Sequence, residues 1–219
     1  MRYYPVCLDI RKRKCLVVGG GSVGTRKVLT LLSCRADITV VSPVVTAALQ
    51  KLADSGSILL KKRPFRASDL EGMFLVFGAT DNEALNRQIH TGAERLGLLC
   101  NIADQPEACN FILPSIVNRG DLIIAISTSG QSPAFAKKLR KDLEAVFGNE
   151  YAVLLKLMGA VRQKLLSRDH QPEAHKPLFE QLLNRNLLAL IKDRKYEDIN
   201  ALLLEILGQG YEFEALMNE

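Results

Sequence analysis

The chain has 219 residues, of which 47% are hydrophobic and 24% are charged, and its formal net charge is +5 at pH 7. These values are typical of a globular protein with one sizeable domain and a smaller appendage, and they exclude disordered and low-complexity classes. The longest apolar runs are far shorter than the roughly 20 residues of a membrane span, and the N-terminus lacks the pattern of a secretory signal. We therefore expect a cytoplasmic protein without a membrane partner. The positive charge by itself suggests an anionic partner, and it does not choose among nucleic acid, a membrane surface and a polyacidic small molecule.

Five apolar segments, rich in β-branched residues, alternate with helical patterns in the first half of the chain. The predicted strands cover residues 15–19, 38–42, 57–61, 74–80 and 98–103, and the intervening predicted helices cover residues 22–34, 46–56 and 82–97. Hydrophobicity in the strands is continuous rather than alternating, which is typical of strands covered on both faces. This order predicts an α/β fold with a doubly wound parallel sheet, in which Gly56 and Gly97 end two of the helices.

A sixth apolar run, residues 122–128, is predicted to be the last strand of this sheet. It precedes a helix that starts at Pro133, for which Ser132 is the expected N-cap. From Asn149 onward the pattern is leucine-rich and helical, with residues 167–172 as the expected connecting loop. The sequence therefore predicts a small helical domain after the sheet.

The five cysteines and three histidines show no spacing typical of a disulfide framework or a metal cage. No two cysteines have the C-x-x-C spacing, and His170 and His175 are five residues apart, which would not place them on one helix face. We expect the cysteines to be mostly reduced core residues, and we expect no dedicated metal site.

A glycine-rich turn follows the first predicted strand. Gly19, Gly21 and Gly24 fit the G-x-G-x-x-G pattern between a strand and a helix. The first glycine allows a tight turn, the second lets the backbone approach a pyrophosphate, and the third lets helix and strand pack closely. The free N–H groups at the helix start would face the anion. This context favours a Rossmann-like dinucleotide site over a purely structural turn.

Two further strand ends contribute to this predicted cofactor site. The second strand ends in Ser42 and Pro43, where many NAD-binding domains carry an acidic residue for the ribose, so the motif alone does not decide between NAD and NADP. No arginine follows immediately to hold a 2′-phosphate, which favours NAD. At the end of the fourth strand, Thr80 and Asp81 would reach the adenosine side of the crevice, although Asp81 fits equally well as the N-cap of the next helix.

Two candidate positions for chemistry remain. Asp104 follows the fifth strand at the carboxyl edge of the sheet, where it fits either a general base or a turn residue before Pro106. Hydroxyls and backbone donors gather at residues 127–133, before a helix that carries Lys137. This arrangement suits the carboxylates of a ligand, or else it is an ordinary capped, solvated basic helix. Other enzyme templates are missing: there is no Tyr-x-x-x-Lys after the sheet, no G-x-S-x-G elbow and no Walker A lysine.

Several segments together carry a more specific resemblance. They are "YPVCLDIRKRKCLVVGGGSVGTRKV", "GATDN", "CNIADQPEACNFILPSIVNRGDLIIAISTSGQSPAFAKKLR" and the helical tail. The chain resembles the precorrin-2 dehydrogenase family of sirohaem synthesis over its whole length, most specifically from Cys100 to Arg140. The resemblance implies a homodimer with an NAD-binding Rossmann domain at residues 1–113, a dimerisation segment at 114–148 and a helical domain at 149–219.

The resemblance also implies an activity and its residues. The expected reaction is the NAD-dependent oxidation of precorrin-2 to sirohydrochlorin. The substrate is a tetrapyrrole with eight carboxylates, and the positive charge of the chain suits such an anionic ligand. Asp104 stands where the family has its essential aspartate. Ser22, Val23, Pro43 and Val44 match the family's cofactor contacts and complete the predicted NAD site. The predicted substrate-binding residues are Asn110, Ser127, Thr128, Ser129 and Lys137.

Two questions stay open at this point. Some relatives also insert iron into sirohydrochlorin in the same cleft, and the sequence does not decide whether this chain does; within these 219 residues we expect no methyltransferase domain. The competing class is an NAD-responsive binding module that senses redox state without turnover. A DNA-binding version should carry a basic second helix, whereas the tail mixes acidic and basic residues, so we expect no nucleic-acid partner.

Overall fold

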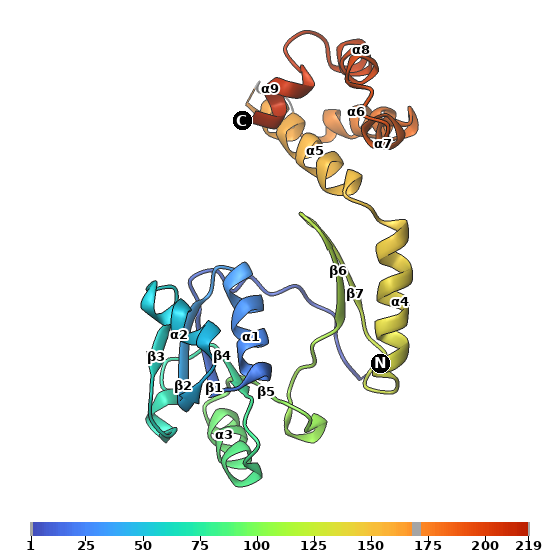
Figure 1. The fold of residues 1–219 in the computed structure, drawn as a ribbon. Helices are drawn as coiled ribbons and strands as arrows, with labels where there is room; N and C mark the ends of the chain where they lie inside the picture. The colour runs from blue at the N-terminus through green and yellow to red at the C-terminus, as the bar shows by residue number, and fades with distance from the viewer. Residues whose placement is uncertain (1, 168–171, 219) are drawn as a thin grey trace. The chain divides into compact units, whose positions relative to one another are not determined.

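The computed structural model describes residues 2–167 and 172–218, except for the side chains of residues 172–174. The chain forms two compact units, Met1–Leu113 and Pro114–Glu219. The finer division at residue 148, and the role of the segment before it, remain predictions. Figure 1 shows the elements of each unit.

The first unit contains a five-stranded parallel sheet in the order β3-β2-β1-β4-β5. Its elements are β1 (Lys14–Gly20), α1 (Ser22–Ser33), β2 (Asp37–Val45), α2 (Ala47–Asp54), β3 (Leu59–Lys61), the 3-10 helix η1 (Ala67–Leu70), β4 (Leu75–Gly78), α3 (Glu83–Arg95), β5 (Leu99–Ile102) and the 3-10 helix η2 (Pro106–Ala108). The predicted α/β fold with a doubly wound parallel sheet is confirmed.

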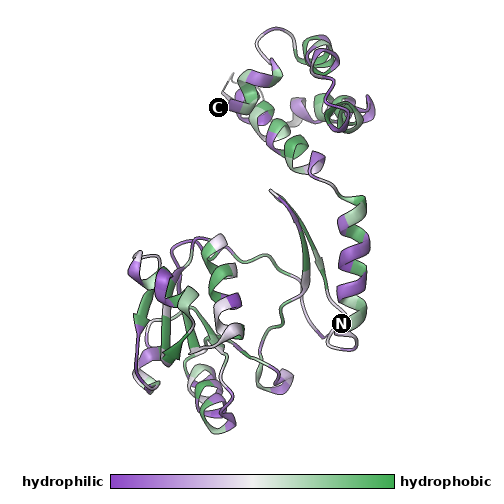
Figure 2. Cartoon of the chain, in the orientation of Figure 1, coloured by the Kyte–Doolittle hydropathy of each residue, from purple (hydrophilic) through white to green (hydrophobic). Residues whose placement is uncertain are grey.

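Both faces of this sheet are covered, as the continuous hydrophobicity of its strands predicts. On one face, Cys15 and Val17 of β1 pack with apolar residues of α1 and α2. On the other face, Leu16 and Val18 pack with residues of α3 and η1. The hydropathy colouring shows the same strands as hydrophobic (Figure 2). Because successive side chains of a strand point to opposite faces, an uninterrupted apolar run fills both cores.

The predicted glycine stops after α2 and α3 are confirmed. Gly56 and Gly97 have positive φ angles of 72° and 64°. After α2, the N–H of Gly56 donates to Ala53 and the N–H of Ser57 donates to Leu52, both to carbonyl oxygens. This pattern satisfies the last carbonyls of the helix and returns the chain toward the sheet.

The second unit starts with a hairpin that corrects one prediction. The predicted sixth strand is β7 (Leu122–Ile126), which pairs antiparallel with β6 (Ser115–Arg119) in a separate two-stranded sheet. Gly120, with a φ of 64°, and Asp121 form the two-residue turn between them. Burial alternates along both strands, because one face packs on a helix and the other does not. A strand at the end of the parallel sheet would have been buried on both faces instead.

Helices make up the rest of the second unit. They are α4 (Pro133–Val146), α5 (Glu150–Leu166), α6 (Pro172–Asn184), α7 (Leu187–Lys192), α8 (Tyr196–Leu207) and α9 (Phe213–Asn218). The predicted N-cap of α4 is confirmed, because the Ser132 hydroxyl accepts a hydrogen bond of 3.2 Å from the N–H of Phe135. α4 packs on the hairpin through Ala136, and the later helices share their own apolar core.

The remaining predictions concern a loop, the cysteines and membrane spans. The expected loop at residues 167–172 and His170 lie largely outside the described residues. All five cysteines are free; Cys15 and Cys100 are buried, whereas Cys7 and Cys34 are exposed. Across residues 2–167 and 172–218, we find no helix with the length and apolar character to cross a membrane.

Candidate functional site

The carboxyl ends of β1 and β4 adjoin at the point where the strand order reverses. Gly19 and Gly20, at the end of β1, are enclosed by the two neighbouring strands. A Cβ on Gly19, whose φ is 114°, would lie 2.1 Å from the Ala79 carbonyl oxygen, and one on Gly20 would lie 2.3 Å from that of Val44. Only glycine fits these positions, since real Cβ contacts never come so close.

The other two glycines of the motif differ from each other. A Cβ on Gly24 would lie 2.2 Å from the Gly19 carbonyl oxygen, so this position needs glycine for α1 to pack on β1. Gly21 has open space around it and is exposed at the N-terminus of α1. Its backbone can therefore be approached by a ligand, and the first turn of α1 contains no acidic residue to repel an anion.

Hydroxyl groups hold the carboxyl end of β2 and the start of α2. The Ser42 side chain is buried and donates a hydrogen bond of 2.6 Å to the Val44 carbonyl oxygen. The Thr25 and Thr46 hydroxyl oxygens lie 2.8 Å apart and join α1 to the start of α2. Pro43 and Val44 are exposed beside the glycine turn. Their side chains can therefore meet a ligand, whereas the buried side chain of Ser42 cannot.

The turn after β4 is fixed by a buried asparagine. The Thr80 hydroxyl donates to Asn86 Oδ1 at 2.7 Å, and Asn86 Nδ2 donates to the Thr80 carbonyl oxygen at 2.9 Å. The N-cap of α3 is Asn82, whose Oδ1 accepts from the N–H of Leu85 at 3.0 Å. The capping alternative for Asp81 is therefore wrong, and its exposed carboxylate is available to a ligand.

Asp104 lies on a short loop that follows β5 and is closed by a thiol. Its φ is 60°, in the left-handed region that a non-glycine residue occupies only when the surrounding structure enforces it. Cys109 Sγ accepts a hydrogen bond of 3.2 Å from the N–H of Ile102. The same thiol donates a hydrogen bond of 3.1 Å to the Gln105 carbonyl oxygen. Burial raises the pKa of the Cys109 thiol, so the group remains a neutral donor.

Asn110, predicted to bind substrate, joins the same loop to the sheet. Its Oδ1 accepts from the N–H of Cys100 at 2.8 Å, and its Nδ2 donates to the Leu98 carbonyl oxygen at 2.8 Å. These bonds hold the loop against the backbone of β5 and the residue before it. Its contact with substrate remains a prediction.

A polar cleft of about 760 Å³ lies at the carboxyl ends of β4 and β5. It is lined by residues of the turn after β4, the start of α3 and the loop after β5, namely Thr80, Asp81, Glu83, Asn86, Arg87, His90, Ala103, Asp104, Gln105, Glu107 and Ala108. The cleft thus joins a predicted cofactor contact, Asp81, and the predicted catalytic residue, Asp104. Doubly wound sheets bind ligands at this edge.

The remaining predicted substrate residues belong to the second unit. The Ser127 and Thr128 hydroxyls each accept a hydrogen bond of 3.1 Å, from the N–H groups of Ser129 and Ser132 respectively. These bonds shape the turn from β7 to α4. Lys137 is exposed on α4.

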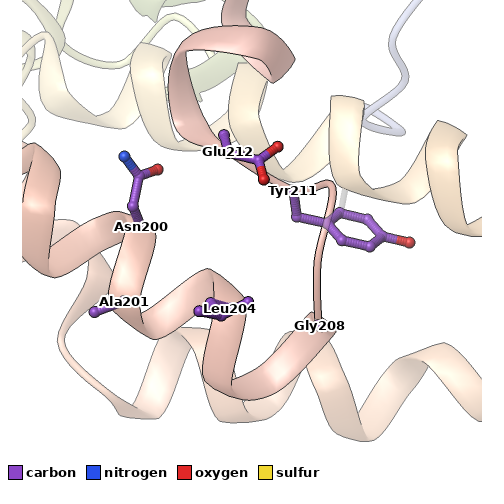
Figure 3. Close-up of a pocket in the computed structure, with 6 residues that line it drawn as sticks. All are labelled: Asn200, Ala201, Leu204, Gly208, Tyr211 and Glu212. Atoms are coloured by element: carbon purple, nitrogen blue, oxygen red, sulfur yellow. The ribbon is translucent and has the colours of Figure 1, made fainter.

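A second cavity, of about 220 Å³, lies among the C-terminal helices and is mainly apolar (Figure 3). Asn200, Ala201 and Leu204 come from α8, and the rest of its lining comes from the segment that leads to α9. Asn200 Oδ1 accepts a hydrogen bond of 2.8 Å from the N–H of Phe213. This cavity contains none of the predicted functional residues, so we place the candidate site at the edge of the sheet.

A parallel sheet in this strand order, with a glycine turn at its switch point, defines the first unit as a dinucleotide-binding α/β domain. The family described as "Putative NAD(P)-binding" matches residues 6–115, and the family described as "Sirohaem biosynthesis protein central" matches residues 119–145. The chain therefore belongs to this NAD(P)-binding family, and the predicted resemblance to the family of sirohaem synthesis is confirmed.

Known proteins resemble the chain beyond these two segments. The siroheme synthase of Methylococcus capsulatus is 36% identical over 205 residues, which are 94% of this chain and 43% of that protein. The siroheme synthase of Nitrosococcus oceani is 36% identical over 211 residues, 96% of this chain and 45% of that protein. The chain thus spans less than half the length of these relatives.

A solved structure matches over nearly the whole chain. SirC, a precorrin-2 dehydrogenase, superposes with a TM-score of 0.78 and 28% sequence identity, covering 93% of this chain and 98% of that one. Together with the family, this match confirms the predicted fold and the nicotinamide cofactor.

Sequence reasoning missed several residues that shape the site. Gly20 stands outside the G-x-G-x-x-G spacing, yet it is as enclosed as Gly19. Asn86 and Cys109 hold the turns after β4 and β5, but a side chain that bonds to a distant backbone group leaves no periodic signal. Lys27 had a readable signal: it lies three residues after Gly24, which places it on the inward face of α1.

Proposed function

We propose that the protein oxidises precorrin-2 to sirohydrochlorin with NAD in sirohaem biosynthesis. The observation that carries this proposal is the placement of Asp104 in the same cleft as Asp81, beside the glycine turn of a dinucleotide-binding domain. The similarity to SirC, a precorrin-2 dehydrogenase, and to siroheme synthases supports the choice of reaction.

The residues of the glycine turn fit NAD. Gly21 leaves the open space that a pyrophosphate needs, and the N–H groups of Ser22 and Val23 at the start of α1 supply donors. Pro43 and Val44 would cover the adenosine half, and the absence of a basic residue directly after Val44 supports NAD over NADP. When bound, NAD supplies the hydride acceptor for the reaction.

Asp104 would act on the proton. Oxidation removes a hydride from carbon and a proton from nitrogen of the tetrapyrrole, so the products are sirohydrochlorin, NADH and one proton. A carboxylate at the sheet edge, on a loop that the Cys109 thiol fastens to β5, can accept this proton. Lys137 and the hydroxyls of Ser127, Thr128 and Ser129 would receive substrate carboxylates. Asn110, in the first unit, would also contact the substrate.

The role of Asp104 is tested by Asp104→Asn, with Glu107→Gln in the same loop as the control. We expect kcat for NADH formation to fall about a hundredfold in Asp104→Asn, because general-base catalysis contributes at least that much, and NAD affinity to stay unchanged. Glu107→Gln should retain wild-type turnover. Full activity of Asp104→Asn would remove the residue from the mechanism.

The proposed dimer uses the β6–β7 hairpin. Ile116 and Ile123 are 42% and 54% exposed on the face that does not pack on α4, and Ala125 lies opposite Ile116. Paired apolar side chains on an open two-stranded sheet favour burial against a second copy. This supports residues 114–148 as the dimerisation segment, followed by the helical domain at 149–219, in a homodimer of the cytoplasm.

A further inference from the structure

Lys27 is a cation on the inward face of α1. By helical spacing it shares this face with Gly24, Val28 and Leu31, which are buried, and Lys27 itself is half-buried. Its Nζ lies 5.2 Å from the centroid of the Phe77 ring on β4, and Phe77 is buried. The ammonium group therefore sits against the apolar end of β4 rather than in open water.

This ammonium group has an uncompensated charge. Within the part of the chain that the structure describes, the Lys27 ammonium group makes no hydrogen bond or ion pair, and it lies over the Phe77 ring. Burial lowers the pKa of Lys27, and the neighbouring charge of Arg26 lowers it too, whereas Cys109 and Asp104 act in the opposite direction. The groups that favour the charged lysine thus belong to the loop after β5.

Asp104 follows β5, the strand that pairs with β4. The N–H of Ala103 donates to the Gly78 carbonyl oxygen at 2.8 Å, and Gly78 directly follows Phe77 in the chain. Asp104 is the next residue after Ala103, and among the described residues its carboxylate likewise has no hydrogen bond or ion pair. A cation against β4 and an anion after β5, both without partners among the described residues, therefore lie near the carboxyl ends of two adjacent strands.

We propose that Lys27 is a positioning residue for the reaction, whose ammonium group draws the Asp104 carboxylate toward the α1 side of the crevice and holds it for the substrate proton. The identity of the reaction rests on the proposed function. The pairing of Lys27 with Asp104 rests on their positions near the ends of β4 and β5. Arg26 and Cys109 are the other ionisable groups that act on Lys27. The ionisable groups that line the cleft with Asp104 are Asp81, Glu83, Arg87, His90 and Glu107.

One test needs neither cofactor nor substrate. The Lys27 amine is titrated by NMR in cofactor-free protein labelled with carbon-13 at lysine Cε, and its signal is assigned by its loss in Lys27→Arg. We expect the titration midpoint to fall in Asp104→Asn, because the carboxylate that favours the charged amine is removed, and to stay in place in Glu107→Gln. An unchanged midpoint in Asp104→Asn would overturn the proposal.

A second test separates positioning from binding. We expect Lys27→Met to lower kcat at least about tenfold, because misplaced catalytic groups lose that much, with the Kd for NAD and the KM for precorrin-2 within about twofold. Lys27→Arg should restore most of the rate, and Arg26→Met, a neighbouring exposed cation, should match the wild type. A raised Kd for NAD with unchanged kcat would make Lys27 a cofactor ligand and contradict the proposal.

The two tests also separate this inference from the proposed function. If the wild-type protein binds NAD but does not oxidise precorrin-2, the proposed function fails. The NMR titration then still decides whether Lys27 and Asp104 act as a pair.

Discussion

Gly21 and Gly24 lie three residues apart in one turn, but a methyl group would meet different surroundings at each. At Gly24 it would press on the Gly19 carbonyl oxygen at 2.2 Å, whereas at Gly21 it would meet nothing within 4 Å. One glycine therefore serves the packing of α1, and the other keeps space free for the cofactor. The motif names both residues but cannot separate these tasks.

We expect Gly21→Ala to raise the Kd for NAD about tenfold while the free energy of unfolding changes by less than about 0.5 kcal/mol, because the methyl group fills only the approach to the pyrophosphate. Gly24→Ala should instead destabilise the fold by about 2 kcal/mol through overpacking. NAD titration and urea unfolding measure the two quantities. Unchanged NAD affinity in Gly21→Ala would contradict the placement of the pyrophosphate.

Cys109 makes a second prediction at the scale of the residue. Its thiol holds the loop that carries Asp104, so Cys109→Ala should lower kcat about tenfold through loss of that geometry, and Cys109→Ser should retain most activity. Cys34→Ala, at an exposed cysteine, is the matched control. Equal kcat values for Cys109→Ala and the control would show that the loop keeps its shape without the thiol.

At the scale of the element, η1 is fastened to the end of β3 by a buried carboxylate. Asp69 is 2% exposed and binds Lys61 at 3.2 Å and Arg63 at 2.5 Å, and it accepts from the N–H of Arg66 at 3.0 Å. Hydrogen bonds from Arg63 hold the pKa of Asp69 well below its usual range, against the opposing effect of burial. This element covers the α3 face of the sheet.

Because the pKa of Asp69 is lower in the folded state than in the unfolded chain, its contribution to stability is fully present above the ordinary carboxyl value of 3.8. The contribution disappears as the pH falls from there through the lowered pKa. Asp69→Asn should therefore destabilise the protein by about 2 kcal/mol at pH 7, and the difference from wild type should shrink below pH 4. Urea unfolding at several pH values measures it, with Glu71→Gln as an exposed control; a pH-independent difference would contradict this account.

Sequence patterns predicted the elements best where burial is periodic or continuous. The five parallel strands and the glycine stops at Gly56 and Gly97 follow from local rules, and all are present. The pairing of β7 with β6 was missed because it depends on which face meets α4, not on the apolar run itself. Of the site, the glycine motif was readable, whereas the bonds of Asn86 and Cys109 depend on tertiary contacts.

At the scale of the whole molecule, the exposed face of the β6–β7 hairpin makes a prediction about assembly. Ile123→Glu should convert a homodimer into a monomer, because a buried, unpaired carboxylate opposes association. Light scattering after gel filtration measures the mass, and NAD titration checks that the first unit remains intact. Leu96→Glu, which places the same charge at a similarly exposed leucine of the first unit, is the control and should leave the mass unchanged. A wild-type protein that is already monomeric would contradict the proposed interface.

We propose that the domain does not merely bind NAD but uses it to oxidise a tetrapyrrole. The most direct measurement is to incubate the purified protein anaerobically with precorrin-2 and NAD and to follow NADH and sirohydrochlorin spectrally. Ferrous iron is then added in a separate step, without the cofactor. We predict one NADH for each sirohydrochlorin, and consumption of sirohydrochlorin in the iron step would add metal insertion as a second activity. Binding of NAD without any NADH would contradict the claim and favour a redox-sensing module.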